Sequence, residues 1–302
     1  MIIVGPTSAG KSRLGFLIAQ NIGGEIISCD AMQVYKEISI ASNKPPLEIL
    51  KKIPHHLINI ISVKNEFNAA VFRKKALGLI KKIHSKNKIP VIVGGTGLYM
   101  AVLLDGIFKD PGQDAVFRRR LEKIAGQKGR AFLHSELQKK DPAAAKKIHP
   151  NDERRIIRAL EVFKITGKPI SELQKNREGI WGKFDIKIFA VMPERQALYE
   201  RINARVDDMF TEGLVDEIRR LKTKKLGKTA QGIIGIKEVQ GFLDGQYDLE
   251  RCRYLMKLKT RHYAKRQLSW FRREKRLKWI ILKENATLRK TAQRIAREMS
   301  HG

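Results

Sequence analysis

The 302-residue sequence predicts an α/β fold, in which a parallel-sheet core carries an inserted all-helical subdomain. Over residues 1–110, short apolar runs alternate with stretches in which apolar residues recur every three or four positions, as in strands joined by helices. Residues 113–178 lack strand patterns, and an apolar run at 184–191 then resumes the sheet. We therefore expect three parts: the first part of the core at 1–112, a helical insertion at 113–183, and the second part of the core at 184–302.

The first strand and helix of the core enclose a phosphate-binding motif. An apolar run at 2–4 precedes the segment GPTSAGKS, and a helix pattern follows at 13–19. The spacing G-x-x-x-x-G-K-S between a strand and a helix is that of a P-loop, whose backbone N–H groups, lysine and serine hydroxyl bind phosphates and Mg²⁺. We expect Ser12 to bind the Mg²⁺. We expect the phosphates to contact eight residues: Gly5, Pro6, Thr7, Ser8, Ala9, Gly10, Lys11 and Ser12.

The remaining elements of the core follow in order along the chain. A strand at 25–30 ends in Asp30, a helix follows at 69–84, and a strand at 89–95 ends in glycines. Beyond the insertion, the patterns predict a strand at 184–191, helices near 194–222 and 249–274, a strand at 277–282 and a final helix. Strands that alternate with helices in this way form parallel sheets with right-handed crossovers.

Three strand ends of this sheet carry polar residues and should meet in one cleft, because parallel sheets bind ligands beyond the carboxyl ends of their strands. These ends are the P-loop, Asp30 and the segment GGTGLY at 94–99. An ATP-hydrolysing P-loop protein usually has an acid at such a strand end to hold Mg²⁺, and the third end lacks one. Asp30 is the candidate acid. It can organise Mg²⁺, act as a general base toward an incoming nucleophile, or only cap the next turn.

Two adjacent histidines, His55 and His56, are the chain's most visible hint of a further metal site. Adjacent side chains seldom both face one ion, and no third ligand is spaced near them. We therefore predict a packed turn at this position.

The charge balance indicates a polyanionic partner. The chain has 61 Lys and Arg against 31 Asp and Glu, which gives a formal net charge of +30. Such an excess favours nucleic acid first and an acidic membrane surface second. The alternative is a solvated basic surface with no such partner.

Two basic helices are candidates for a nucleic-acid contact. In NDERRIIRALEV, Arg154 and Arg158 share one helix face at a spacing of four, with Arg155 beside them. Asp152 is placed to cap this helix. The later segment TRHYAKRQLSWFRR mixes cations with aromatic residues, which suits phosphate contacts and base stacking. Each segment can instead be a solvated helix whose aromatic residues lie in the core.

Further features of the sequence bear on compartment and assembly. No stretch reaches the roughly 18 apolar residues of a membrane span, so we expect no membrane partner. The first strand pattern begins at Met1, which leaves no room for a targeting peptide. Cys29 and Cys252 form neither a metal-binding nor a disulfide pattern. We therefore expect a cytoplasmic protein, and we take a monomer as the default.

Taken together, the motifs resemble those of the tRNA dimethylallyltransferases, the bacterial tRNA isopentenyltransferase family. The resemblance runs nearly end to end, and HPNDERRIIRALEV and AKRQLSWFR are specific on their own. The matching segments stand in the family's order and spacing: GPTSAGKS, EIISCDAMQVYK, PHHLINI, VIVGGTGLYM, DPAAAKKIHPNDERRIIRALEVFKITGKP, RINARVDDMF and TRHYAKRQLSWFR.

The resemblance implies a reaction and a set of site residues. A dimethylallyl group would move from dimethylallyl diphosphate to N6 of the adenosine just 3′ of the anticodon, in tRNAs that read codons starting with U. The P-loop would then hold an isoprenoid diphosphate in place of ATP. Asp30 is implied as the general base, with Thr7 facing the reacting centre and Arg205 assisting the diphosphate. The positions implied to contact the tRNA anticodon stem-loop are Asp30, Ala31, Met32, Gln33, Thr96, Arg118, Arg154, Arg155, Ile156, Ile157 and Arg158.

The sequence departs from the family pattern at a few positions. Ala31 stands where the family usually has serine, and the segments IASNK and GIIGIKE differ from the usual forms. No Cys/His finger follows the core, so the chain looks bacterial. Three rival functions share parts of the pattern: a small-molecule kinase, a transferase acting on free adenine nucleotides, and an RNA-binding protein that uses a nucleotide only as a switch.

Overall fold

The structure, a computed structural model, describes residues 1–108, 111–282 and 287–300 and divides into two compact units. The core unit comprises Met1–Ala101 and Gly182–Gly302, and the helical unit comprises Val102–Trp181. None of the described helices combines the length and the apolar character that a membrane crossing requires.

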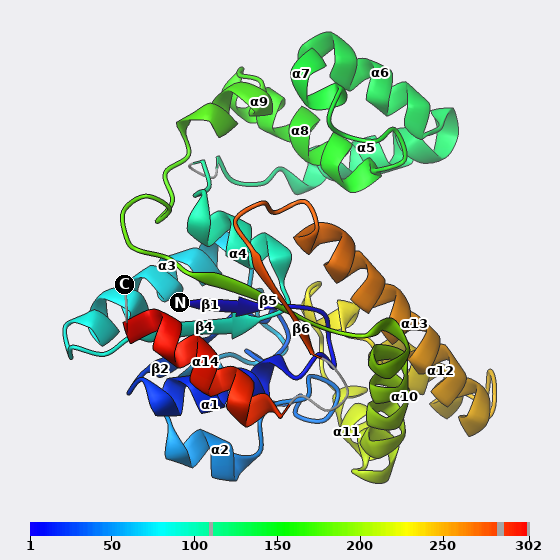
Figure 1. Ribbon diagram of the computed structural model, residues 1–302. Helices are drawn as coiled ribbons and strands as arrows, with labels where there is room; N and C mark the ends of the chain where they lie inside the picture. The colour runs from blue at the N-terminus through cyan, green and yellow to red at the C-terminus, as the bar shows by residue number, and fades with distance from the viewer. Residues whose placement is uncertain (109–110, 283–286, 301–302) are drawn as a thin grey trace. The chain divides into compact units, whose positions relative to one another are not determined.

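The core unit is built on one sheet of six parallel strands in the order β3-β2-β4-β1-β5-β6 (Figure 1). Strands β1 and β4 are buried along their whole length, because both faces of the central sheet are covered, whereas β6 alternates exposed and buried residues. The predicted α/β class is confirmed. The strands are β1 (Ile2–Val4), β2 (Glu25–Ser28), β3 (His55–His56), β4 (Pro90–Gly94), β5 (Ile188–Pro193) and β6 (Lys278–Leu282).

The helices of the core unit follow the strands along the chain. They are α1 (Lys11–Asn21), α2 (Leu47–Lys52), α3 (Ala69–His84), α4 (Gly97–Leu104), α10 (Arg195–Thr211), α11 (Leu214–Leu221), the 3-10 helix η2 (Ala230–Gly232), α12 (Ile236–Leu243), α13 (Leu249–Phe271) and α14 (Leu288–Ser300). Helix α4 begins in the core unit and continues into the helical unit.

Several element boundaries differ from the sequence prediction. The helix expected at 194–222 is divided into α10 and α11 at Gly213, whose φ of +95° is a left-handed conformation that favours glycine. The strand expected from residue 184 begins only at Ile188, where it pairs with Ile2 of β1. Strand β2 ends at Ser28, so Asp30 lies in the loop beyond it. Helices α2, α4 and α12 were not predicted.

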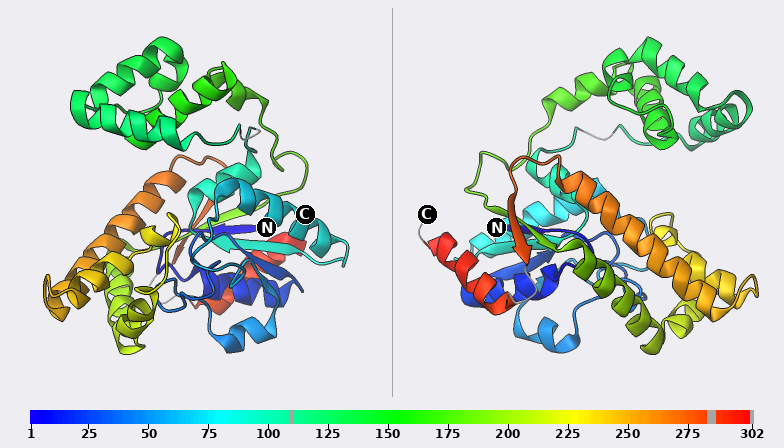
Figure 2. Two further views of the ribbon diagram at one scale, coloured as in Figure 1. Left: turned by 180° about the vertical axis from the view of Figure 1, so that it is seen from behind. Right: turned by 45° about the vertical axis from the view of Figure 1, so that its right-hand side comes forward.

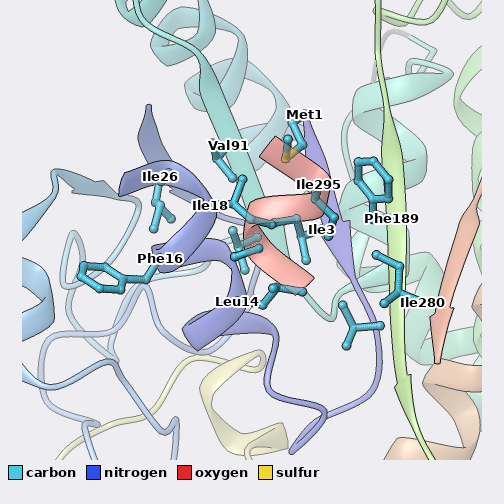
Figure 3. Close-up of a cluster of buried hydrophobic side chains, with 14 of the residues drawn as sticks. Met1, Ile3, Leu14, Phe16, Ile18, Ile26, Val91, Phe189, Ile280 and Ile295 are labelled. Atoms are coloured by element: carbon cyan, nitrogen blue, oxygen red, sulfur yellow. The ribbon is translucent and has the colours of Figure 1, made fainter. Parts of the chain in front are cut away.

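One hydrophobic core of this unit fills the space between helices α1 and α14 and the sheet (Figure 3). Leu14 and Ile18 of α1 and Ile295 of α14 point toward Ile3 and Phe189 on the strands. The two helices also pack on each other. This packing fixes α1, and with it the P-loop at its N-terminus, against the central strands.

Helices α10 and α13 run alongside each other in the same unit (Figure 2). Leu198 and Ile202 of α10 pack against Ala264 of α13. Each of these helices brings side chains to the carboxyl edge of the sheet, as described below.

The two histidines form the edge strand β3 rather than the expected turn. The β3 residues pair with Ile26 and Ile27 of β2, and the side chain of His56 reaches back to Glu25. Within the described residues, no group of three or more His, Cys, Asp and Glu side chains is arranged to hold a metal ion.

Glu25 is a buried carboxylate with three basic neighbours. Its side chain is 1% exposed, and its oxygens lie 2.8 Å from His56 Nε2 and 3.2 Å from the Nζ atoms of Lys86 and Lys88. Burial by itself raises the pKa of Glu25, but the hydrogen bonds from His56, Lys88 and Lys86 outweigh it and lower the pKa to about 2. The ionised carboxylate therefore stabilises the fold.

Glu25→Gln is expected to destabilise the core unit by about 1–3 kcal/mol at pH 7, since three donors lose a charged acceptor. The contribution is full above the unfolded carboxyl pKa of 4.5 and is lost as pH falls toward the folded value of about 2. Thermal unfolding from pH 7 to pH 3 should show the gap between wild type and variant narrowing. Glu48→Gln, at an exposed site on α2, is the control. A gap that stays constant down to pH 3 would contradict this account.

The helical unit contains α5 (Ala115–Lys128), α6 (Arg130–Lys140), α7 (Pro142–Ala145), α8 (Glu153–Thr166), α9 (Ile170–Leu173) and the 3-10 helix η1 (Gln174–Asn176). It has its own hydrophobic core, to which α8 contributes most. The predicted cap is confirmed, because the Asp152 carboxylate accepts a hydrogen bond from the N–H of Arg155 over 3.3 Å.

The helical unit starts earlier than the expected residue 113. The N–H groups of Ile180 and Trp181 donate to the carbonyls of Leu103 and Leu104 over 3.1 and 3.0 Å. These bonds join the two ends of the insertion, so the end of α4 belongs to the same compact unit.

Candidate active site

The P-loop takes its shape from two glycines. Gly5 has a φ of +150°, and a Cβ atom there would lie 2.4 Å from the carbonyl oxygen of Val191 on β5. Gly10 has a φ of +85° and forms the N-terminal boundary of α1. Side chains at either position would disturb the loop, which explains the glycine spacing of the motif.

Lys11 supplies one cation to this loop. Its ammonium donates to the carbonyl oxygen of Pro6 over 2.6 Å. Burial lowers the pKa of Lys11 to about 8, while Asp30 acts to raise it and Arg205 to lower it further. The mutual influence of these three groups places them in one electrostatic site.

Arg205 reaches the same loop from α10. Its Nη1 donates a hydrogen bond to the hydroxyl of Thr7. Its Nε is buried and has no hydrogen-bond partner among the described residues, and the same is true of the Ser8 hydroxyl. Burial lowers the pKa of Arg205 to about 10, with Asp30 opposing that shift. Buried polar groups are normally hydrogen-bonded, so two orphans beside a P-loop indicate a site built for a polar ligand.

Asp30 lies in the loop beyond β2. Its Oδ1 accepts hydrogen bonds from the N–H groups of Met32 at 2.8 Å and Gln33 at 3.4 Å, so the residue does cap the following turn. No hydrogen bond to Oδ2 is found in the described parts of the chain. Since Asp30 also lines the pockets described next, one oxygen holds the backbone and the other is available for chemistry.

The residues around Asp30 make different contacts. The Thr96 hydroxyl accepts a hydrogen bond from the Ala31 N–H over 3.1 Å, which joins the β4 end to the Asp30 loop. Met32 faces a pocket. Gln33 is turned inward, where its amide group accepts from Ser28 Oγ and donates to the carbonyl of Asn43. Its side chain thus supports the loop from within.

Two pockets meet at this edge of the sheet and share the residues Thr7, Asp30, Ser42 and Arg205. One, of about 400 Å³, is lined by the P-loop and by further polar side chains. The other, of about 200 Å³, has a mostly apolar lining of Met32, Val206, Met209, Ile233, Ile234 and Met256. A polar compartment rich in basic residues and an apolar compartment therefore adjoin, with a carboxylate at their junction.

Gln267 of α13 was not identified as a site residue from the sequence. Its Oε1 accepts from the N–H of Thr7 and its Nε2 donates to the carbonyl of Gly95, both over 2.8 Å. It thereby ties the P-loop to the end of β4. Its position in the helix could have indicated this role, because Gln267 is a polar residue on the buried face of α13, together with Ala264 and Phe271.

Glu217 of α11 was also missed. Its carboxylate accepts from the backbone N–H groups of Ser39, Ile40 and Ala41 at 2.7–2.9 Å. Ala41 and Ser42 line the pockets, so Glu217 holds the loop that forms one wall. No local pattern links a helix to a loop almost 180 residues away.

The basic positions of the helical unit fall into two groups, which differ in exposure and in their contacts. Arg154 and Arg155 are exposed. Ile156 and Ile157 are 0% and 6% exposed and belong to the core of the unit, so their side chains are not available to RNA, contrary to what the resemblance implied. Arg118 and Arg158 both contact Glu161.

Comparisons with known proteins bear on this site. The family model described as IPP transferase matches residues 33–274. Curated tRNA dimethylallyltransferases are similar to this chain: that of Carboxydothermus hydrogenoformans is 47% identical over 93% of this chain and 91% of its own, and that of Geobacter sulfurreducens is 44% identical over the same shares.

Solved structures of tRNA-modifying transferases are also similar to this chain. The tRNA isopentenylpyrophosphate transferase of Bacillus halodurans matches with a TM-score of 0.72 and 37% identity, over 99% of this chain and 95% of its own. A eukaryotic dimethylallyltransferase acting on tRNA matches with a TM-score of 0.83 and 32% identity, over 99% of this chain and 78% of its own.

Proposed function

Because this chain belongs to the IPP transferase family and transfers a dimethylallyl group to tRNA, we propose that dimethylallyl diphosphate is its donor. The acceptor is N6 of the adenosine 3′ of the anticodon, in tRNAs that read codons starting with U. The enzyme works as a monomer in the cytoplasm, where that tRNA is found.

The adjoining pockets are the observation that carries this proposal. The P-loop compartment suits a diphosphate, and the apolar compartment suits a five-carbon prenyl group or a flat base. The two share Asp30 and Arg205, so the bond to be broken and the groups that assist it lie at the junction.

Cations at the P-loop assist departure of the diphosphate. Negative charge develops on it as the allylic C–O bond breaks, and fixed donors in a buried site stabilise such charge strongly. Lys11 and residues of the P-loop backbone line the pocket that would hold it. The Nε of Arg205, which has no partner in the described residues, and the Ser8 hydroxyl are further donors toward it.

The donor set also fits Mg²⁺. This ion takes oxygen ligands and is commonly held by one or two protein groups together with substrate phosphates. Ser12 lines the P-loop pocket and would offer its hydroxyl to the ion, beside the phosphates of the donor. When bound, Mg²⁺ supplies additional positive charge to the leaving diphosphate.

Asp30 acts on the acceptor. The adenosine leaves its stack to enter the site, N6 forms a bond to the allylic carbon as the C–O bond breaks, and the N6 proton passes to the Asp30 carboxylate. The hydrogen bonds to Oδ1 hold the carboxylate in place. Products are the N6-prenylated adenosine and diphosphate.

Exposed and partly exposed cations hold the rest of the tRNA. The anticodon stem-loop contacts Arg118, Arg154, Arg155 and Arg158 of the helical unit, while Ala31, Met32 and Thr96 lie beside the reacting base. Ile156 and Ile157 anchor α8 in its unit and so present the three arginines of that helix.

The test is mass spectrometry of nucleosides from tRNA incubated with enzyme and dimethylallyl diphosphate. The proposal predicts one prenylated adenosine, and none when guanosine replaces the adenosine 3′ of the anticodon. AMP offered in parallel should react far more slowly. Equal turnover of AMP and tRNA would assign the enzyme to free nucleotides instead.

A further inference from the structure

A carboxylate in the helical unit is buried between two surface arginines. The side chain of Glu161 on α8 is fully buried. It accepts hydrogen bonds from Nε and Nη2 of Arg118 at 2.7 Å, from Nη1 of Arg158 at 2.6 Å, and from the N–H of Asp114 at 2.8 Å. The contact with Arg118 is bidentate, the geometry that most restricts a guanidinium.

Burial of a carboxylate is unfavourable unless it is paired and hydrogen-bonded. Here four donors satisfy it, and the hydrogen bonds from Arg118, Arg158 and the Asp114 amide outweigh burial and lower the pKa of Glu161. The charge persists at neutral pH. Such a pair is weak evidence for a gain in stability, because an apolar replacement often does as well.

The arginines are held without being covered. Their side chains remain 27% and 26% exposed, respectively, for Arg118 and Arg158. Arg158 Nη1 also donates to the carbonyl of Gly112 over 2.9 Å, so this nitrogen is held by two acceptors at once, Gly112 and Glu161. By contrast, Arg155 is 57% exposed and its partner Asp152 lies on the surface. Glu161 thus orders two cations at the surface of a basic unit.

We propose that Glu161 is a positioning residue that holds Arg118 and Arg158 as a preformed fork for backbone phosphates of the RNA substrate. The inference rests on the proposed function, which supplies the RNA. An arginine that is already ordered loses less conformational freedom when it binds a phosphate. The buried carboxylate thereby improves RNA affinity although it carries the same charge as the RNA.

The negative charge of Glu161 allows a test based on the direction in which RNA affinity changes. Glu161→Gln removes a negative charge, and charge alone would then strengthen RNA binding. Loss of the fork would weaken it. The matched control is Glu122→Gln, which removes the same charge at an exposed position of α5 in the same unit.

The experiment measures the affinity of the full-length chain for an anticodon stem-loop RNA by fluorescence anisotropy at several salt concentrations. We expect Glu161→Gln to weaken binding about tenfold and Glu122→Gln to leave it equal or tighter. With intact tRNA, KM for tRNA should rise for Glu161→Gln while kcat and KM for the donor stay near wild type. Affinity for Glu161→Gln that matches or exceeds that of Glu122→Gln would overturn the proposal.

A second variant, Arg118→Lys, keeps the proposal testable if Glu161→Gln fails to fold. Arg118→Lys keeps the charge but cannot make the bidentate contact, and it should weaken RNA binding to a similar degree. The double variant should bind no more weakly than either single one. Wild-type affinity of Arg118→Lys would refute the fork. Because binding is read without catalysis, this outcome is separate from a failure to prenylate tRNA, which would refute the proposed function alone.

Discussion

Asp30→Asn lowers kcat for prenyl transfer by about 10²–10⁴-fold, the usual contribution of a general base. Asparagine keeps an Oδ1 acceptor for the N–H groups of Met32 and Gln33, so the loop retains its shape. It cannot take the proton from N6. The measurement is single-turnover transfer with saturating donor and tRNA, alongside the affinity for tRNA, which should stay near wild type.

The control for this variant is Asp208→Asn on α10, an exposed aspartate. It should transfer the prenyl group at the wild-type rate. Retained transfer in Asp30→Asn would remove Asp30 as the base. Loss of tRNA affinity in parallel with the loss of rate would mean that Asp30 serves binding.

Arg205→Ala should lower kcat by about 10²–10³-fold, since it removes a fixed donor from a buried site where charge develops. The inhibition constant of inorganic diphosphate should rise with it, because the same guanidinium holds the product. Arg205→Lys keeps a charge but loses the Nε group and the guanidinium that contacts Thr7, so an intermediate rate is expected.

Arg195→Ala, at an exposed position of α10, is the matched control and should leave both values unchanged. If Arg205→Ala altered the affinity for tRNA but not the inhibition by diphosphate, the assignment of Arg205 to the donor would be contradicted.

The sequence predicted those parts of the site that depend on local order. The P-loop lies within one strand–loop–helix segment, and its glycine positions follow from backbone conformation at Gly5 and Gly10. Asp30 follows a strand, so the rule for parallel sheets placed it at the same edge. The cap at Asp152 has a similarly local cause.

The rest of the site depends on contacts between distant segments. The apolar compartment draws Met32, Met209, Ile233 and Met256 from four parts of the chain, and of these only Met32 was among the predicted site residues. Gln267 and Glu161 are polar residues on buried helix faces, which a sequence presents only as breaks in an apolar pattern. The break at Gly213 is similar, since glycine occurs within helices as well as between them.

The prediction of a turn at the two histidines was wrong for a related reason. Ligand spacing argued against a metal, but nothing local indicated that His56 pairs with a buried carboxylate on the neighbouring strand. Glu25 stands at the start of an apolar run in the sequence, and only the structure shows that it is buried and therefore needs basic partners from elsewhere in the chain.

The central claim is that the P-loop binds the diphosphate leaving group of a prenyl donor and does not bind a nucleoside triphosphate. It is tested most directly by incubating the wild-type protein with labelled dimethylallyl diphosphate and tRNA in the absence of any nucleoside triphosphate. We predict equal amounts of prenylated adenosine and diphosphate. A parallel incubation contains labelled ATP. Transfer of its γ-phosphoryl group to an acceptor, with no prenylated nucleoside formed in either incubation, would contradict the claim.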